Sequence, residues 1–519
     1  MTRYFVLLIS LTGWFVVTAG NIDLTGKWAV KLDRDQIKMS GVEPHQTYRD
    51  SIHLPGALHT QGYGDDVTAQ TKWYSGNLST LWYYHPMYEK YRQAGNIKIF
   101  DFLQPKKHYI GKAWYKRTIE VPAEIKDKEC FLYLERVHWQ STLYVNGHLA
   151  GSNKGLGTAH EYNISPYVKS GKNEITLCVD NSQIVDIGRI PHSISEQTMA
   201  AWNGVLGKMQ LRIKDKIRID EVQVFPDYEK KQAIVKIKVA NAFSSSEKIQ
   251  LRLKAQSYNS LNKFSGKEIL NEGVVNPDTI TTLEIVYPFK GKVQEWNEFN
   301  PFLYQLNISL ESAKATDLVT ETFGFRDLKL NGRRFALNGR TVSIRGNLNC
   351  GEFPLDGFPE MGVDWWKKIF LLHKEWGHNT VRFHSWCPPE AAFIAADEVG
   401  IYLQPEAGEW GAILTPVQEK FITEETDRMI RQYGNHPSWV FFAMGNELRC
   451  DTKIMEKFIA RNKADNRRFV TGKVNGRPLL ESFDFASSHS INQKRVRHHM
   501  GWPPRSEEHT SELQSRLHL

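Results

Sequence analysis

Apolar and polar side chains alternate with a period of two along several short segments of the first 215 residues. This period is typical of strands that bury one of their two faces. The predicted strands are Trp114–Val121, Phe131–Leu134, Leu143–Val145 and Ile175–Val179. Asn146-Gly147 follows the third of them and favours a two-residue hairpin turn, because both residue types tolerate a positive φ. The pattern predicts a β-sandwich over residues 20–215.

The same period of two continues from residue 216 to residue 327. Ala233–Val239 and Ile249–Ala255 alternate in this way, and the polar run Ser244–Ser246 between them indicates a turn. A stretch of about 110 residues with about seven strands has the size of an immunoglobulin-like sandwich. We therefore expect a second, separate β domain here.

From residue 328 onward the pattern changes to strands that alternate with amphipathic helices. The predicted strands are Thr341–Arg345, Thr380–Phe383, Ile401–Gln404 and Trp439–Ala443, with two more near Phe469–Lys473 and Phe485–Ser488. The predicted helices are Val363–Trp376, with Trp365, Ile369, Leu372 and Trp376 on its apolar face, Pro389–Val399 and Val417–Tyr433. This order predicts a parallel sheet. Because a closed (β/α)₈ barrel needs eight strands, residues 328–504 are expected to form only its N-terminal part. The predicted fold class is a multidomain protein with β and α/β parts.

Composition and charge narrow the choice of partners. The chain has 519 residues and a net charge of +8, which is spread along the sequence. A nucleic-acid partner would call for a clustered basic patch with a known motif, and Lys494–Arg497 is better explained as a solvated basic loop. The five cysteines are widely separated, which is neither a disulfide framework nor a zinc pattern. A bridge between Cys130 and Cys178 or buried thiols both remain open, and no metal site and no cofactor are predicted.

The two ends of the sequence carry patterns of their own. Met1–Ala19 has a basic residue, an apolar run and small residues at its end, as in a secretory signal peptide. The apolar run is shorter than the ~20 residues that a membrane span requires, and no later stretch qualifies, so we expect a periplasmic or extracellular protein. Arg505–Ser515 matches a translated sequencing-library adapter, and we exclude residues 505–519 from the fold. The natural chain is expected to continue beyond Pro504.

Candidate catalytic residues follow the C-terminal end of the fourth predicted strand of the α/β part. Asn446 and Glu447 follow an apolar run there, and catalytic groups of a (β/α)₈ barrel sit at the C-terminal ends of its strands. The plain alternative is a helix N-cap followed by an acid in the first turn. Retaining glycoside hydrolysis needs two carboxyl groups about 5–5.5 Å apart, one as acid/base and one as nucleophile.

A wider match favours the catalytic interpretation. NHPSWVFFAMGNE resembles the acid/base motif of glycoside hydrolase family 2, which includes β-galactosidases, β-glucuronidases and β-mannosidases. WYKRTIEVP, LYVNGHLAG and GKNEITLCVDN resemble the jelly-roll sugar-binding domain of that family, and NPFLY with GFR resembles the end of its immunoglobulin-like domain. The resemblance covers about Asn21 to Pro504. It implies a jelly roll at 20–215, an immunoglobulin-like sandwich at 216–327 and part of a TIM barrel at 328–504.

The resemblance also implies roles for individual residues. Glu447 would be the acid/base of a retaining exo-β-glycosidase, and Asn446 would hydrogen-bond the sugar 2-hydroxyl. Arg382, His384 and Glu406, at other strand ends, would contact an oligo- or polysaccharide substrate. The nucleophile of the family ends strand seven, so we expect this chain to lack it and to be inactive. A β-galactoside is the first choice of substrate and a β-glucuronide the second. A carbohydrate-binding protein without turnover is the alternative.

Overall fold

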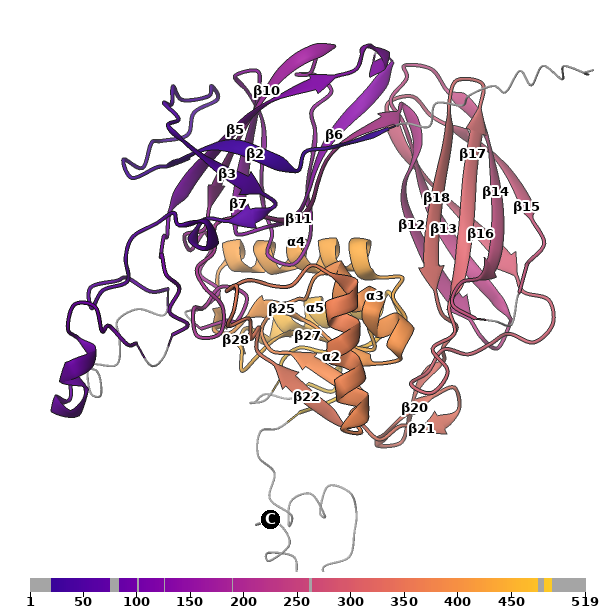
Figure 1. Ribbon diagram of the computed structural model, residues 1–519. Helices are drawn as coiled ribbons and strands as arrows, with labels where there is room; N and C mark the ends of the chain where they lie inside the picture. The colour runs from indigo at the N-terminus through magenta and orange to yellow at the C-terminus, as the bar shows by residue number, and fades with distance from the viewer. Residues whose placement is uncertain are drawn as a thin grey trace, which may run out of the picture.

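The chain folds into three successive parts, two β-sandwiches and an α/β unit (Figure 1). The computed structural model describes residues 20–74, 84–99, 102–125, 127–188, 190–260, 264–474 and 480–487. The predicted signal peptide and the adapter-like tail lie outside these residues. None of the helices in the described ranges has the length and apolar character that a membrane crossing requires. Because strands far outnumber helices in the described residues and three parts follow one another, the protein is a mostly β, multidomain chain.

The first β-sandwich consists of two antiparallel sheets that share one apolar core. One sheet has the order β3-β2-β5-β10-β7-β8, and the other has the order β1-β11-β6-β9, with β4 beside β11. The strands are β1 (Asn21–Asp23), β2 (Gly26–Leu32), β3 (Asp50–Leu54), β4 (Gly56–Ala57), β5 (Lys112–Val121), β6 (Lys128–Val137), β7 (Gln140–Val145), β8 (His148–Lys154), β9 (His160–Asn163), β10 (Gly171–Asp180) and β11 (Gly204–Asp215), with short 3₁₀ helices at His59–Gln61, Pro86–Tyr91 and Ala123–Ile125. The four strands predicted in this region lie within β5, β6, β7 and β10 and are confirmed.

The predicted hairpin turn between β7 and β8 is also confirmed. Val145 pairs with His148 across the turn, and both residues between them have positive φ, 51° at Asn146 and 84° at Gly147. These dihedral angles match a type I′ turn, whose twist fits the right-handed twist of the two strands.

The second β-sandwich has a three-stranded sheet, β12-β13-β16, and a four-stranded sheet, β15-β14-β17-β18. Its strands are β12 (Ile217–Asp227), β13 (Gln232–Asn241), β14 (Glu247–Ser257), β15 (Ile269–Val275), β16 (Thr279–Pro288), β17 (Tyr304–Ser312) and β18 (Thr316–Phe323). Alternate residues of both sheets point into a separate core. The two strands predicted here lie within β13 and β14. The size and the two-sheet arrangement agree with the expected immunoglobulin-like sandwich.

The α/β unit follows a small antiparallel sheet and contains parallel strands with helices between them. Its elements are β19 (Leu328–Asn331), β20 (Arg334–Leu337), β21 (Arg340–Thr341), β22 (Gly346–Asn349), α2 (Val363–Glu375), β23 (Thr380–Phe383), α3 (Glu390–Val399), β24 (Tyr402–Gln404), β25 (Glu406–Glu409), β26 (Ala412–Ile413), α4 (Pro416–Tyr433), β27 (Phe441–Gly445), β28 (Arg449–Cys450), α5 (Thr452–Lys463) and β29 (Phe469–Thr471). Parallel pairing joins β22-β23-β24 and β25-β27-β29. A parallel bridge between Leu403 and Trp439 links the two sets.

Two strand predictions for the α/β unit are wrong. The first parallel strand is β22, at Gly346–Asn349, and not Thr341–Arg345. The N–H of Arg345 donates to the side-chain oxygen of Asn379 at 2.9 Å, so the ladder with β23 begins only at Gly346. The described part of the predicted strand Phe485–Ser488 is irregular.

The predicted apolar face of α2 is also wrong. The buried side chains on this helix are Trp366 and Phe370, whereas Leu372 and Trp376 are 43% and 79% exposed. Tryptophan and leucine at helical spacing occur on two faces of this helix, and packing against α3 and the strands selects the face of Trp366. Cys130 and Cys178 are buried free thiols, so the possible bridge between them is not formed.

Helix α4 connects the α/β unit to the first β-sandwich (Figure 1). Glu425 on this helix is buried, and its carboxylate accepts the backbone N–H of Leu156 at 3.0 Å and that of Gly157 at 2.6 Å. The Tyr433 hydroxyl donates to the Gly157 carbonyl at 2.8 Å. A buried carboxylate that accepts two N–H groups fixes both position and orientation, so these contacts set how the two parts meet.

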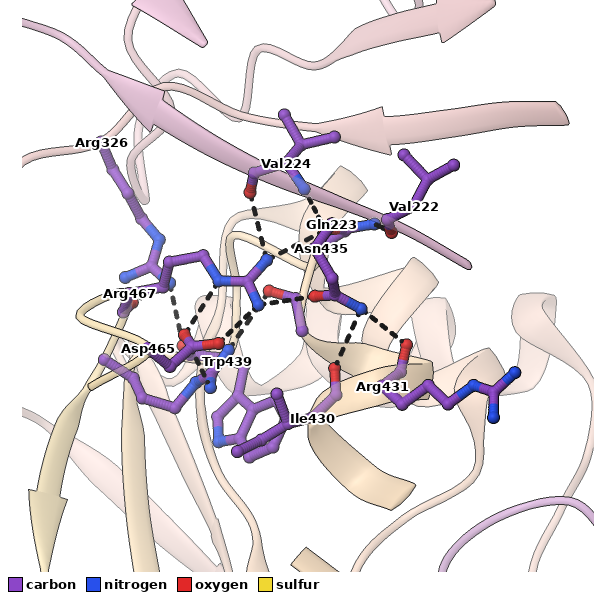
Figure 2. Close-up of polar contacts among 12 residues, drawn as sticks. Val222, Gln223, Val224, Arg326, Ile430, Arg431, Asn435, Trp439, Asp465 and Arg467 are labelled. Carbon is purple, nitrogen blue, oxygen red and sulfur yellow. Dashed lines mark hydrogen bonds and ion pairs between the residues drawn. The ribbon is translucent and has the colours of Figure 1, made fainter. Parts of the chain in front are cut away.

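The second β-sandwich contacts the C-terminal end of α4, and Arg467 of the α/β unit takes part in this contact (Figure 2). Arg467 holds Asp465 with two hydrogen bonds, at 2.9 and 2.6 Å. The same guanidinium donates to the carbonyl of Val224 and to the side chain of Gln223 on β12. Asn435, after α4, accepts from Arg467 and from the Val224 N–H. One arginine therefore ties together β12, the end of α4 and the start of β29.

Candidate functional site

Glu447 lies just beyond the C-terminal end of β27, the fourth parallel strand when β24 and β25 are counted as one interrupted strand. Its backbone has φ 45°, in the left-handed region, and its N–H donates to the Val474 carbonyl at 2.8 Å. The side chain is exposed. The Nε1–H of Trp410 donates to Glu447 Oε2 at 3.2 Å. A non-glycine residue held in this conformation is often found at functional sites.

Arg382, Glu406 and Asn446 form one hydrogen-bonded cluster next to Glu447. Arg382, on β23, donates from Nε to Glu406 Oε1 at 2.6 Å and from Nη2 to Asn446 Oδ1 at 2.9 Å. The other carboxylate oxygen of Glu406 accepts the N–H of Ser385 at 2.7 Å. Glu406 and Asn446 are fully buried. Charge-assisted bonds of this kind fix side chains firmly, so the cluster presents Asn446 in one orientation.

The amide nitrogen of Asn446 has no hydrogen-bond partner among the described residues, although it is buried. Gly445 precedes it, and a Cβ there would collide with the carbonyl of Glu409, so glycine permits the close approach of β25. The backbone N–H of Asn446, unlike its side-chain amide, has a partner and donates to that same carbonyl at 3.0 Å. A buried donor without a partner is costly. The orientation imposed by Arg382 therefore leaves the side-chain NH₂ group able to bind a ligand oxygen.

His384 follows β23 and lies against a loop of the first β-sandwich. Its Nδ1 is 3.0 Å from Nδ1 of His192, and both rings are at least nine-tenths buried. Trp410 contacts both imidazoles, with ring centroids 4.4 Å from His384 and 5.7 Å from His192. Burial lowers the pKa of His192 to about 4, so its imidazole is neutral at physiological pH. Trp410 thus separates the histidine pair from Glu447 and touches both.

Glu409 is a second carboxyl group in the same region, but it is fully enclosed. Both of its side-chain oxygens are buried and have no hydrogen-bond partner among the described residues. Burial raises its pKa well above 4.5, and the nearby carboxyl groups of Asp186 and Glu425 raise it further. Desolvation penalises the charged form of an acid, so Glu409 is held as a neutral acid beneath the exposed Glu447.

The five predicted site residues lie in one region of the structure. Arg382, Glu406 and Asn446 contact one another directly, while Trp410 joins Glu447 to His384. Their roles remain predictions. His192 could not be found from the sequence, because it lies far away in the chain, in another domain. Trp410 was not predicted as a site residue either. It directly follows the strand that carries Glu406 and Glu409, and an aromatic residue at a strand end is the signal that could have indicated it.

Two regions of the chain match family models. Residues 22–205 match the sugar binding domain of glycosyl hydrolases family 2, and residues 217–326 match a second model, named glycosyl hydrolases family 2. The chain carries two domains of glycosyl hydrolase family 2. Both matched regions are β-sandwiches, and the α/β unit with Glu447 follows them directly.

Curated relatives of this chain include two bacterial β-galactosidases. The enzyme of Thermoanaerobacterium thermosulfurigenes is 23% identical over 391 residues, which cover 71% of this chain and 53% of the relative. That of Clostridium acetobutylicum is 21% identical over 483 residues, 86% of this chain and 48% of the relative. The chain spans about half the length of the curated relatives it matches. A solved β-glucuronidase of Bacteroides uniformis has the same fold, with a TM-score of 0.66, 19% identity, and coverage of 88% of this chain and 52% of that one.

Proposed function

We propose that this site belongs to an exported retaining β-glycosidase that hydrolyses terminal β-linked sugars, with Glu447 as its acid/base. The position of Glu447 carries the proposal. It is the exposed carboxyl group at the C-terminal edge of parallel strands, next to a buried cluster of Arg382, Glu406 and Asn446. Catalytic groups of (β/α)₈ barrels occupy this edge, and the two family 2 domains precede it.

Each residue has a chemical task in this proposal. Glu447 is open to solvent, so its proton can reach the oxygen of a leaving group, and the Trp410 N–H steadies the resulting carboxylate. Asn446 offers its unpaired N–H to a sugar hydroxyl. Arg382 is neutralised by Glu406 and acts mainly by orienting Asn446. The arrangement is a preorganised half of a glycosidase site.

Retaining hydrolysis also needs a nucleophilic carboxylate about 5–5.5 Å from the acid. Among the described residues after Glu447, three carboxylates have partners that tie them to other parts of the fold. Asp451 caps α5, Asp465 pairs with Arg467 and Arg468, and Asp484 pairs with Lys463. We therefore propose that the 519-residue chain binds sugar without turning it over.

β-Galactosides are the first choice of substrate, in line with the β-galactosidases among the relatives by sequence, although putative β-glucuronidases of Formosa agariphila are relatives by sequence too. A β-glucuronide is the second choice, and the solved β-glucuronidases share the fold. The carboxylate of a glucuronide would need a cation with free donors, whereas Arg382 already holds Glu406. A carbohydrate-binding protein without any catalytic parent is the third possibility, and only turnover in a longer form of the protein separates it from the first.

The test is to incubate the purified chain with aryl β-galactoside and aryl β-glucuronide and to follow both phenol release and binding by calorimetry. We expect binding without release. Asn446→Ala should weaken binding by about tenfold, the value of a well-placed hydrogen bond, whereas Asn276→Ala, in an exposed turn, should not. Phenol release by the wild-type chain would refute the absence of turnover. Unchanged binding by Asn446→Ala would refute the site itself.

A further inference from the structure

Three metal-ligating side chains from separate segments meet beside Trp410. His192 comes from the first β-sandwich, Cys350 directly follows β22, and His384 directly follows β23. One donor atom from each of the three lies within 4.8 Å of the others. Both histidines are buried, and Cys350 is partly buried. No spacing in the sequence connects them, because His192 stands more than 150 residues before the other two.

The surrounding hydrogen bonds hold these three side chains in place. The backbone N–H of His192 donates to Ser385 Oγ at 2.8 Å, and that hydroxyl donates to the carbonyl of His384 at 2.7 Å. The N–H of Cys350 donates to Glu352 Oε2 at 2.8 Å. Supporting contacts of this kind orient the ligands of metal sites, so the cluster is preorganised by both domains.

The distances suit a tetrahedral ion. Two imidazole nitrogens bound to Zn²⁺ at ~2.0–2.1 Å stand about 3.3 Å apart, and the two Nδ1 atoms here are 3.0 Å apart. A thiolate at ~2.3 Å from the ion needs only a small closure of the 4.8 Å cluster. Imidazole and thiolate select zinc over magnesium or calcium, which prefer oxygen ligands.

We propose that His192, Cys350 and His384 bind one Zn²⁺ ion that links the first β-sandwich to the α/β unit. Binding displaces the thiol proton, which passes to solvent, while the Nδ1 proton shared by the two imidazoles is replaced by a proton on Nε2 of the same ring, so that both histidines bind as neutral ligands. A water molecule or the Glu352 carboxylate completes the coordination. His384 then serves as a metal ligand, and Trp410, rather than His384, is the group that faces the sugar beside Glu447.

The first experiment uses Co²⁺ as a spectroscopic stand-in for Zn²⁺ on the full chain. Tetrahedral cobalt with a thiolate ligand gives a sulfur-to-metal charge-transfer band in the near ultraviolet and intense d–d bands in the visible. We expect both, with one Co²⁺ per chain, and we expect one equivalent of Zn²⁺ to abolish them. Absence of both bands, or bands of octahedral type, would overturn the proposal.

Substitutions then assign the ligands. Cys350→Ser should remove the charge-transfer band, and His192→Ala should weaken Co²⁺ binding by at least tenfold, since loss of a supporting group alone typically costs 10–100-fold. Cys450→Ser is the matched control, because Cys450 is also a partly buried free thiol but lies outside the cluster. A charge-transfer band that survives Cys350→Ser, or one lost equally in Cys450→Ser, would contradict the assignment. Circular dichroism of each variant identifies misfolding, and the wild-type spectrum decides the case if a variant fails to fold. The experiment measures no sugar binding, so it stands apart from the proposed glycosidase.

Discussion

The two ends of strand β27 are built in opposite ways. At its amino end, the side-chain amides and the carboxylate are saturated with hydrogen bonds, because Asp465, Asn435 and Gln223 all have partners on both polar atoms (Figure 2). At its carboxyl end, both oxygens of Glu409 and the amide nitrogen of Asn446 have no partner among the described residues. Buried polar groups are normally paired. The amino end, called the saturated end because its amides and its carboxylate are fully paired, although Arg326 Nη1 and Arg468 Nε have no hydrogen-bond partner among the described residues, fixes the domains. The carboxyl end, called the unsaturated end, keeps an acid and an amide available for a ligand.

The same contrast appears in the charges. At the amino end, burial alone would raise the pKa of Asp465, but Arg468 and Arg467 outweigh it and lower that pKa to about 2. At the carboxyl end, burial raises the pKa of Glu409 well above 4.5, and neighbouring carboxyl groups add to this effect. One buried acid is therefore ionised and anchored, and the other is neutral. The difference teaches that burial does not decide the charge of an acid, whereas the number of cations around it does.

Removing Arg467 should give the largest effect. Arg467→Met leaves Asp465 with fewer partners and cuts the bonds to β12, so we expect a loss of about 3–5 kcal/mol, as for other broken buried ion pairs. The midpoint of urea unfolding, followed by circular dichroism, measures it. Arg461→Met is the control, since its pair with Asp427 is about half-exposed and worth less than about 1 kcal/mol. Equal effects would mean that the amino end is not an anchor.

Asp465→Asn tests the ionised acid through its pH dependence. The pKa of Asp465 is lowered from 3.8 to about 2 in the folded chain, which corresponds to about 2 kcal/mol. A lowered folded-state pKa contributes stability above the unfolded pKa, and that contribution is lost as the pH falls through the folded pKa. The wild type should therefore exceed Asp465→Asn in stability at pH 7, and the gap should close between about pH 4 and pH 2. A gap that does not change with pH would contradict the pairing.

Glu409→Gln tests the neutral acid and should have the opposite sign. A raised folded-state pKa means that stability is lost as the pH rises above the unfolded value of 4.5. The glutamine cannot ionise, so we expect it to stabilise the chain at pH 7 by about 1 kcal/mol, as single stabilising substitutions commonly do. The gain should vanish below pH 4.5. Glu425→Gln is the control and should destabilise, because its carboxylate accepts two backbone N–H groups. Destabilisation by Glu409→Gln at pH 7 would show that an ionised carboxylate is needed there.

The sequence predicted the strands of the β-sandwiches better than the elements of the α/β unit. Period-two alternation placed β5, β10 and β13, because one face of each strand is buried and the other is not. It failed at Thr341–Arg345, where a side chain, Asn379, takes the backbone hydrogen bond that a strand would use. On α2, the helical spacing fitted two faces, and only tertiary packing chose Trp366.

Some residues of the candidate site could be predicted from the sequence and others could not. Arg382, Glu406, Asn446 and Glu447 could be placed from the sequence because each stands at a strand end, and parallel strands bring these ends to one edge. His192 and Cys350 could not, since their meeting depends on how the first β-sandwich docks against the α/β unit. That docking depends on α4 contacts such as the one between Glu425 and Gly157. Single contacts of this kind produce no periodic pattern in the sequence, so they cannot be predicted from it.

The smallest effect should come from Trp410→Phe at the carboxyl end of β27, and a tryptophan at the amino end provides the matched comparison. Trp410→Phe keeps an aromatic ring beside His384 and removes only the N–H that donates to the exposed Glu447, so the free energy of unfolding should change by less than about 0.5 kcal/mol. Trp439→Phe is the matched substitution at the saturated end, where the ring is fully buried and Arg468 lies 4.0 Å from its centroid. Phenylalanine weakens this cation–π contact, leaves a cavity and removes the Nε1–H that donates to the Phe441 carbonyl, so we expect a loss of about 2 kcal/mol. Urea unfolding followed by far-ultraviolet circular dichroism measures both, because fluorescence would change with the tryptophan itself. If Trp410→Phe destabilises as much as Trp439→Phe, the carboxyl end is as much a structural anchor as the amino end, and the contrast between them fails.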